Sequence, residues 1–145
     1  MPSAKAQSPI RRILEEAFNE GNLAVIDELV TPDSVTRSAN WGIPSGREGW
    51  KQLTATFRTA FPDLCCTIED EIQMGSKYAA HWTIRGTHEG MLLGNRPTGR
   101  TVLVEGVIFA HVAGDRVAEY RILVDRFGML QQLGLVPPPT NLAKR

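Results

Sequence analysis

Three side chains in the second half of the chain could carry out acid–base chemistry. Asp125 is an isolated carboxylate in "EYRILVDRFGMLQQLG", between a strand-like run and a helix-like run. Asp70 shares the apolar side of an alternating segment with Ile68 and Ile72, where an unpaired charge would be costly. Tyr120 is at a position of its strand-like segment whose side chain is predicted to face inward. A carboxylate in a desolvated pocket can act as a general base, which makes Asp70, Tyr120 and Asp125 the catalytic candidates.

Both carboxylates also fit a structural role. Aspartate is a leading N-cap residue, so the sequence favours Asp125 as the cap of the helix "RFGMLQQLG", accepting from the amide of Gly128 or a neighbour. A bulge at "EDE" would shift the pleat and expose Asp70 instead of burying it. Both alternatives stay open for Asp70.

The three histidines have different surroundings. His81 shares the polar side of its strand with Arg85, which predicts an outer-face position. His111 lies near a hairpin tip and is predicted at the surface or an interface. His88, in "GTHEG", either orients a loop at the rim of a pocket or hydrogen-bonds a ligand.

Helical segments come first along the chain. "SPIRRILEEAFNEG" predicts a helix capped by Ser8 and ended by Gly21, with an apolar stripe at helical spacing. "NLAVIDELV" predicts a short second helix. "SGREGWKQLTATFRTAF" predicts a third, in which Ser45 and Glu48 have capping-box spacing.

Four segments of period two follow: residues 64–75, 77–86, 101–112 and 116–124. Together they predict a single α+β domain, a cone-shaped barrel with the N-terminal helices packed in the concave face of a curved, mainly antiparallel sheet. Such a cone can leave an apolar cavity at its open end. Residues 9–137 form the domain, with tails at 1–8 and 138–145.

Charge and cysteine usage narrow the function classes. Sixteen basic and sixteen acidic residues cancel, so neither nucleic acid nor a membrane surface is indicated as a partner. No apolar run is close to the length of about 18 residues that a membrane-spanning helix needs. Cys65 and Cys66 are neighbours in a strand and point to opposite faces, which makes a disulfide or a metal pair unfavourable. Cys66 is predicted to be buried, and a reducing, cytoplasmic compartment fits best.

The motifs "GTHEGMLLGNRPTGRTV", "EGVIFAHVAGDRVAEYR" and "DRFGMLQQLGLVP" resemble the SnoaL-like polyketide (ester) cyclases. This family belongs to the superfamily of α+β cones named for nuclear transport factor two. "RRILEEAFNEGN", "GREGWKQL" and "AFPDL" match the first half of the same family, so the resemblance covers about residues 9–137. It implies a deep apolar pocket for a small hydrophobic molecule, chemistry without metal or coenzyme, and a homodimer or homotetramer.

The best-understood members of that family close a ring by intramolecular aldol condensation, with an aspartate base and a nearby histidine. The matching positions here are Ile108 and Ile122, which the hairpin is predicted to bring opposite each other. The resemblance therefore implies a member without the usual acid–base pair. The residues predicted to line its substrate pocket are Phe18, Trp41, Trp82, His88, Ile108 and Ile122.

Several functions remain open. The first is a cofactor-free cyclase or isomerase acting on a polyketide-like or other hydrophobic molecule. The second is epoxide opening by Asp70, Arg85 and Asp125, although the alternation along their strands does not place the three side chains on one face. The third is non-catalytic binding of an apolar small molecule, which the loss of the acid–base pair favours. A protein-interaction role has support only from the superfamily's namesake.

Overall fold

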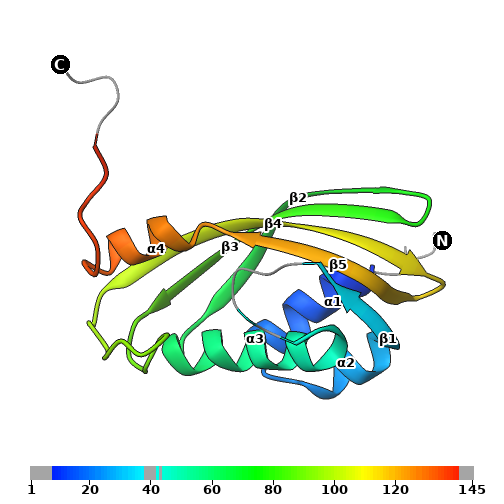
Figure 1. Cartoon of the computed structure of the whole chain (residues 1–145), viewed down its shortest axis with the longest axis horizontal. Coiled ribbons are helices and arrows are strands. Elements are labelled where there is room, and N and C mark those ends of the chain that lie inside the picture. Colours follow the sequence, from blue (N-terminus) through cyan, green and yellow to red (C-terminus); the bar gives the residue numbers. More distant parts are fainter. Residues whose placement is uncertain (1–7, 38–41, 43, 141–145) are drawn as a thin grey trace.

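The computed structural model describes residues 8–37, 42 and 44–140. A five-stranded sheet runs in the order β1-β5-β4-β3-β2 (Figure 1). Neighbouring strands pair antiparallel except β1 and β5, which are parallel. In chain order, the elements are α1 (Pro9–Arg12), η1 (Ile13–Asn19), α2 (Ala24–Leu29), β1 (Val30–Thr36), α3 (Gly46–Ala60), β2 (Cys65–Met74), β3 (Lys77–Thr87), β4 (Thr101–Ala113), β5 (Arg116–Val124) and α4 (Arg126–Gln132).

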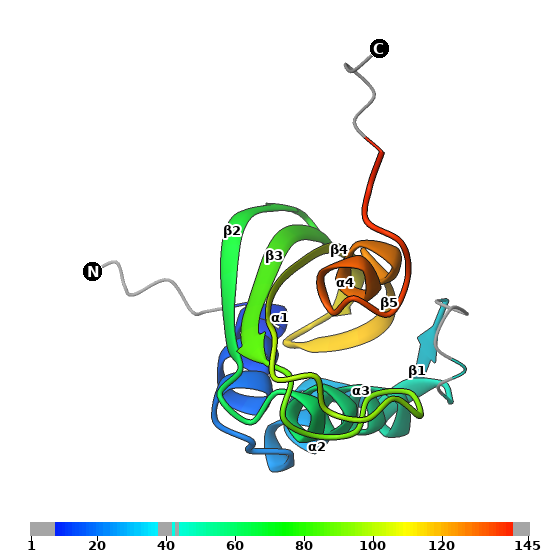
Figure 2. The same cartoon turned by 90° about the vertical axis from the view of Figure 1, so that its left-hand side faces the viewer.

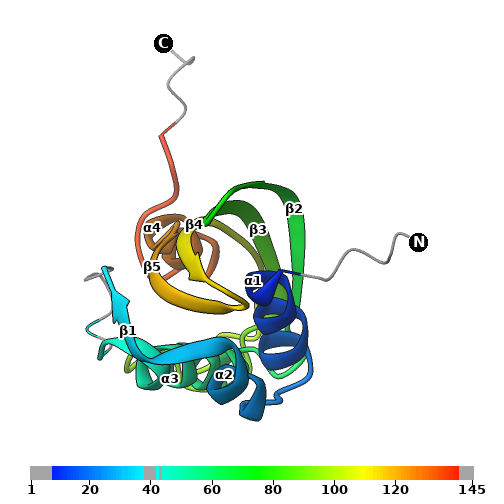
Figure 3. The ribbon, with the colours of Figure 1, turned by 90° about the vertical axis from the view of Figure 1, so that its right-hand side faces the viewer.

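The sheet curves over the N-terminal helices. Figures 2 and 3 show strands β2 to β5 wrapping around one side of the molecule, with α1, α2 and α3 on the concave side. Helix α4 and the loop 88–100 lie at the end of the sheet opposite the hairpin turns (Figure 1). The predicted α+β class and the helices in the concave face of a mainly antiparallel sheet are confirmed.

The first helix has two parts. Ser8 caps it by accepting from the backbone N–H of Arg11 at 3.0 Å, as predicted. From Ile13 to Asn19 the helix is a π-helix, which the apolar spacing did not indicate. Its end is as predicted: Gly21 has a φ of +76°, and its N–H donates to the carbonyl of Ala17.

The segment 30–36 was not predicted as a strand. Helix α2 ends at Leu29, and the chain continues as β1, which contains Pro32 and lies parallel to β5 at the edge of the sheet. Proline lacks a backbone donor, so an edge position of this kind tolerates it. From Val30 to Thr36 apolar and polar residues do not alternate regularly, and buried and exposed side chains do not alternate regularly either.

Helix α3 begins at Gly46 without the predicted capping box. The Ser45 hydroxyl accepts from the backbone N–H of Thr36 at 2.8 Å, and the Thr36 hydroxyl accepts from the N–H of Gly46 at 3.0 Å. These two bonds tie the start of α3 to the end of β1. Ser45 thus joins two elements and makes no side-chain cap bond within its own helix.

Strand β2 contains a bulge between Ile68 and Asp70. Ile68 pairs with the inward-facing Trp82, but Asp70 pairs with His81 on the outer face. A bulge adds one residue to one strand, so every later side chain changes face. Ile72 and Met74, predicted to face inward, are therefore 65% and 78% exposed.

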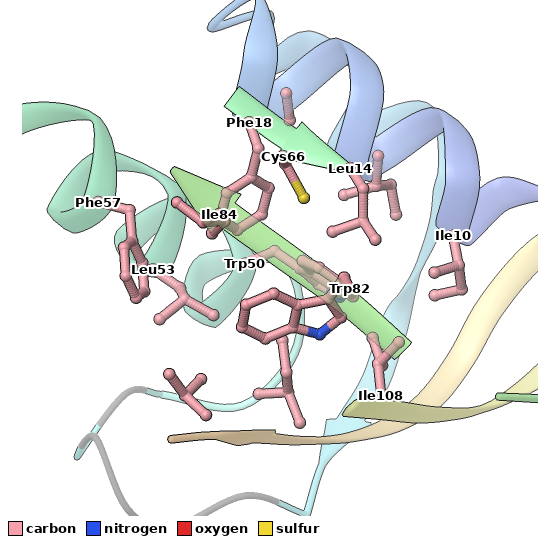
Figure 4. Close-up of a cluster of buried hydrophobic side chains, with 14 of the residues drawn as sticks. Ile10, Leu14, Phe18, Trp50, Leu53, Phe57, Cys66, Trp82, Ile84 and Ile108 are labelled. Carbon is pink, nitrogen blue, oxygen red and sulfur yellow. The ribbon is translucent and has the colours of Figure 1, made fainter. Parts of the chain in front are cut away.

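The core fills the space between the helices and the concave face of the sheet, as Figure 4 shows for the cluster around Trp50 and Trp82. Trp82 lies so close to β4 that a Cβ at Gly106 would be 2.3 Å from its ring. Only glycine permits this approach. No helix in the described ranges is long and apolar enough to cross a membrane.

Candidate functional site in the cone interior

The two positions that match the family's acid–base pair lie opposite each other. Ile108 on β4 pairs with Ile122 on β5, and both side chains are buried, as the hairpin predicted. The centre of the inner sheet face is therefore apolar. Neither side chain can exchange a proton.

Tyr120 lies two residues from Ile122 on the same face of β5 and is 1% exposed. Its ring lies against that of Trp50 on α3, with 4.4 Å between the centroids. Among the described residues its hydroxyl has no hydrogen-bond partner of normal geometry. Burial raises the pKa of Tyr120 to about 12, although the nearby Thr36 hydroxyl opposes part of the rise. At neutral pH the group is therefore a protonated donor.

Two indoles add further donors in the same buried cluster as the isoleucine pair. Trp82 on β3 is two residues beyond Ala80, which pairs with Ile108. Within the described part of the chain, the Nε1 atoms of Trp50 and Trp82 are buried without an acceptor. Trp82 was predicted to line the pocket, whereas Trp50 was not. Helical spacing predicts an apolar-face position for Trp50, and only the folded chain shows that its N–H lacks an acceptor.

Phe18 on η1 is buried in the same interior, with its ring centroid 6.4 Å from that of Phe57 (Figure 4). Trp41, also predicted to line the pocket, lies outside the described residues.

His88 is fully buried at the end of β3. Its Nδ1 accepts from the backbone N–H of Thr98 at 3.1 Å, so the ring proton of the neutral side chain lies on Nε2. In the described structure this Nε2 is buried without an acceptor. The backbone of His88 also bonds Arg100 and Gly99 across the loop. These contacts support the loop-orienting interpretation, and the engaged Nδ1 lone pair is not available to act as a base.

Asp125 is the N-cap of α4. Its carboxylate accepts from the backbone N–H of Gly128 at 3.0 Å, and the residue is exposed. The cap interpretation is confirmed.

Asp70 is on the wrong face for a role in the interior. It is exposed on the outer face of the sheet, because the β2 bulge moves it there. The prediction that it shares the apolar face with Ile68 is wrong, and the alternative of a bulge is confirmed.

The other two histidines lie where the sequence put them. His81 Nε2 is 2.8 Å from Glu105 Oε1 on the outer face. His111 is exposed near the β4–β5 turn.

Charged groups are lacking in the described part of the interior. The buried polar side chains there are Ser34, Thr54 and His88, so the described ranges bury no carboxylate, lysine or arginine. Those ranges also contain no group of three or more His, Cys, Asp or Glu side chains that could hold a metal ion. The described interior therefore consists of apolar surface with a few hydrogen-bond donors.

This fold and this hairpin define a known class. Residues 8–133 match the family model of the SnoaL-like polyketide cyclases, and the chain belongs to that family. No curated protein matches it.

Solved structures agree with this assignment. Two of them are each named a "putative polyketide cyclase". IdmH from Streptomyces antibioticus is 33% identical over 88% of this chain and 99% of its own, with a TM-score of 0.73. The Acidithiobacillus ferrooxidans protein is 27% identical over 92% and 97%, with a TM-score of 0.77. A Catenulispora acidiphila protein with a ketosteroid isomerase-like fold, solved with trimethylamine, is 17% identical over 93% and 100%, with a TM-score of 0.72, and it supports the fold alone.

Proposed function

We propose that this protein is a cofactor-independent enzyme of the cyclase or isomerase type. It takes up a hydrophobic, polyketide-like small molecule in the interior of the cone and acts on it through hydrogen-bond donors in place of the usual acid–base pair. The observation that carries the proposal is the buried Tyr120 hydroxyl beside Ile122, which has no partner of normal geometry among the described residues.

A buried donor without an acceptor costs about 1 to 3 kcal/mol. Tyr120, Trp50 and Trp82 each present such a donor, and all three belong to the same buried cluster. A ligand with carbonyl or enol oxygens would satisfy donors that the described chain leaves unmatched. A cationic ligand would find no buried carboxylate in the described ranges to pair with it.

The chemical role of these donors is to stabilise an enolate. A proton between two carbonyl groups is acidic enough to pass to solvent water when the resulting oxyanion is held by preorganised donors. In an aldol closure the enolate carbon then attacks the second carbonyl, and the new alkoxide takes up a proton. Tyr120 donates to the enolate oxygen, because its hydroxyl is protonated at neutral pH and burial raises its pKa further.

Non-catalytic binding is the second candidate. The Ile108–Ile122 pair and the engaged Nδ1 of His88 favour it, because the described interior then lacks a strong base. Epoxide opening has no comparable support, since Asp70, Arg85 and Asp125 are all exposed.

Proton exchange separates the two candidates. A 1,3-diketone that carries an aromatic ring is incubated with the protein in deuterated water, and loss of the proton between the carbonyls is followed by NMR. Thermal shift with the same compound reports binding. We expect binding and accelerated exchange in the wild type, and about a 100-fold slower exchange in Tyr120→Phe, the usual cost of one oxyanion donor.

Tyr78→Phe is the matched control, because the Tyr78 hydroxyl already donates to Glu71 at 2.5 Å. Its exchange rate should equal that of the wild type. Binding without accelerated exchange would establish the non-catalytic candidate. Absence of both binding and exchange, extended to a panel of larger aromatic polyketones, would refute the proposal.

A further inference from the structure

Three buried hydrogen-bond donors come from the elements that meet at the start of helix α3. Within the described chain, Ser34 on β1, Trp50 on α3 and Tyr120 on β5 each leave such a donor without an acceptor. Strand β1 pairs with β5, and the Thr36 hydroxyl at its end accepts from the N–H of Gly46, the first residue of α3. The three donors are therefore neighbours in space although they are far apart in the sequence.

Two close contacts place Ser34 and Tyr120 beside the first turn of α3. A Cβ at Gly46 would be 2.9 Å from the carbonyl oxygen of Ser34. A Cβ at Gly49 would be 3.2 Å from the Tyr120 hydroxyl. Residues three apart on a helix share one face and are about 5 to 6 Å from each other. Ser34 and Tyr120 therefore flank the same face of this turn.

The three side chains are shielded from water. Ser34 is 5% exposed, Tyr120 1% and Trp50 0%. A buried donor that has neither a protein partner nor water is costly, and a ligand oxygen that accepts from more than one of them would remove that cost.

The charges around the start of α3 favour an anion. The N-terminus of this 15-residue helix is the positive end of its dipole. The Arg47 guanidinium donates to two backbone carbonyls at 2.8 Å and forms no ion pair with a carboxylate in the ranges that the structure covers. Glu48 in the same turn opposes this positive charge, but it is exposed, so solvent screens it.

We propose that the start of α3 binds a negatively charged oxygen of the ligand, a carboxylate or an enolate, and that Ser34 and Tyr120 donate to it. A neutral carbonyl could use the same donors but would gain less from the helix end and from Arg47. The inference rests on the proposed function for the position of the ligand in the interior, and it requires no catalytic step.

Isothermal titration calorimetry at neutral pH tests the carboxylate. It compares 2-naphthoate with 2-naphthamide, which has a similar size and shape but no charge. The carboxylate should bind at least about tenfold more tightly, because hydrogen bonds to a charged group are stronger than those to a neutral one. Benzoate with benzamide, and anthracene-2-carboxylate with its amide, extend the comparison to smaller and larger ligands.

Ser34→Ala tests the new donor. It should weaken the binding of the carboxylate by about tenfold or more and that of the amide less, and Tyr120→Phe should act in the same direction. Thr54→Val is the matched control, because it removes a buried hydroxyl that already donates to the carbonyl of Trp50 at 2.8 Å. Both affinities should stay at the wild-type value in this control. Circular dichroism of each variant confirms that it is folded.

A second measurement tests the enolate. The enolate of an aromatic 1,3-diketone absorbs at longer ultraviolet wavelengths than the neutral compound, so a titration with excess protein gives the pH at which the bound diketone ionises. We expect this midpoint at least about one pH unit below that of the free compound, which corresponds to a tenfold preference for the enolate. Ser34→Ala should move it back toward the free value. A preference for the carboxylate alone would identify the ligand as an acid, and a shift of the diketone alone would identify it as an enolate.

Failure of this inference can be told apart from failure of the proposed function. Equal or absent binding of every acid and its amide, together with an unshifted diketone, would overturn the inference, and so would a Ser34→Ala variant that keeps both effects. Accelerated proton exchange alongside those results would leave the proposed function standing. Preference for the anion without accelerated exchange would support the inference together with the non-catalytic candidate.

Discussion

Tyr78 and Tyr120 are two buried tyrosines on the inner face of the sheet, and their hydroxyls differ. The Tyr78 hydroxyl donates to Glu71 at 2.5 Å, whereas that of Tyr120 has no acceptor of normal geometry among the described residues. Removing a hydrogen-bonded hydroxyl leaves its partner without that bond and lowers stability. Removing an unbonded buried hydroxyl removes the cost of keeping it away from water. The same substitution should therefore have opposite effects at the two positions.

We expect Tyr120→Phe to leave the free energy of unfolding unchanged or to raise it by about 1 kcal/mol, and Tyr78→Phe to lower it by a similar amount. Urea unfolding of the two variants, followed by circular dichroism, measures both changes. A clear loss of stability in Tyr120→Phe would mean that its hydroxyl has a partner in the free protein and would weaken its assignment as a ligand donor.

For single residues, the sequence predicted the face of the sheet correctly wherever inward and outward side chains alternate regularly along the strand. Ile108 and Ile122 were placed opposite each other because a tight hairpin fixes the register of its two strands. Trp50 was missed because the same spacing describes a core tryptophan and a ligand donor. Only the absence of an acceptor around Nε1 distinguishes the two, and that is a property of the folded chain.

At the scale of elements, Asp125 fixes the start of α4. This helix is short and packs on β4 through the Gln132 side chain, which donates to the carbonyl and accepts from the N–H of Leu103. We expect Asp125→Ala to lower the free energy of unfolding by about 1 kcal/mol, and Asp125→Ser, which keeps a capping oxygen, to lower it much less. Thermal unfolding of both variants checks the difference; an equal loss in the two would mean that the cap bond is not what Asp125 supplies.

Asp63 joins the end of α3 to the end of β3. Its carboxylate accepts from the Thr87 backbone N–H at 2.7 Å and from the Thr87 hydroxyl at 2.8 Å, and these bonds, the backbone one first, hold the pKa of Asp63 below its ordinary value of 3.8. A carboxyl with a lowered pKa in the folded state stabilises the fold above its unfolded pKa, and this contribution is lost as the pH falls through the folded pKa.

The stability of Asp63→Asn should therefore change less between neutral pH and the range below 3.8 than that of the wild type. Urea midpoints across this range provide the measurement. Asp115→Asn, in the exposed β4–β5 turn, is the control and should retain the wild-type dependence on pH. An identical pH profile for Asp63→Asn and the wild type would show that the Thr87 contacts do not perturb this carboxyl.

The elements themselves were predicted where hydrophobic periodicity is strong, as in α3 and the β4–β5 hairpin. Strand β1 was missed because Pro32 interrupts it and because its partner, β5, is more than eighty residues away in the sequence. The bulge in β2 was foreseen only as an alternative. Its position in "EDE" carries no glycine or proline, and the choice of face depends on the partners that Glu71 finds in Arg11 and Tyr78.

At the scale of the whole molecule, one hydrophobic core joins the helices to the sheet. Trp50 on α3 and Trp82 on β3 belong to the same cluster, so neither layer can open without exposing the other. We expect a single unfolding transition in urea, with the same midpoint by far-ultraviolet circular dichroism and by tryptophan fluorescence. Two separate midpoints would contradict the prediction of one domain over residues 9–137.

The β2 bulge makes the chain sensitive to a change of length at one place. Before the bulge β2 contributes Cys66 to the core, and after it the same strand turns Glu71 toward Arg11 and Ile72 outward. Deleting one residue between Glu69 and Glu71 would restore regular alternation, draw Ile72 and Met74 into the cone and expel Glu71. A loss of three nucleotides there would therefore change which side chains β2 presents on both faces of the sheet. It would do so without replacing any side chain of the interior.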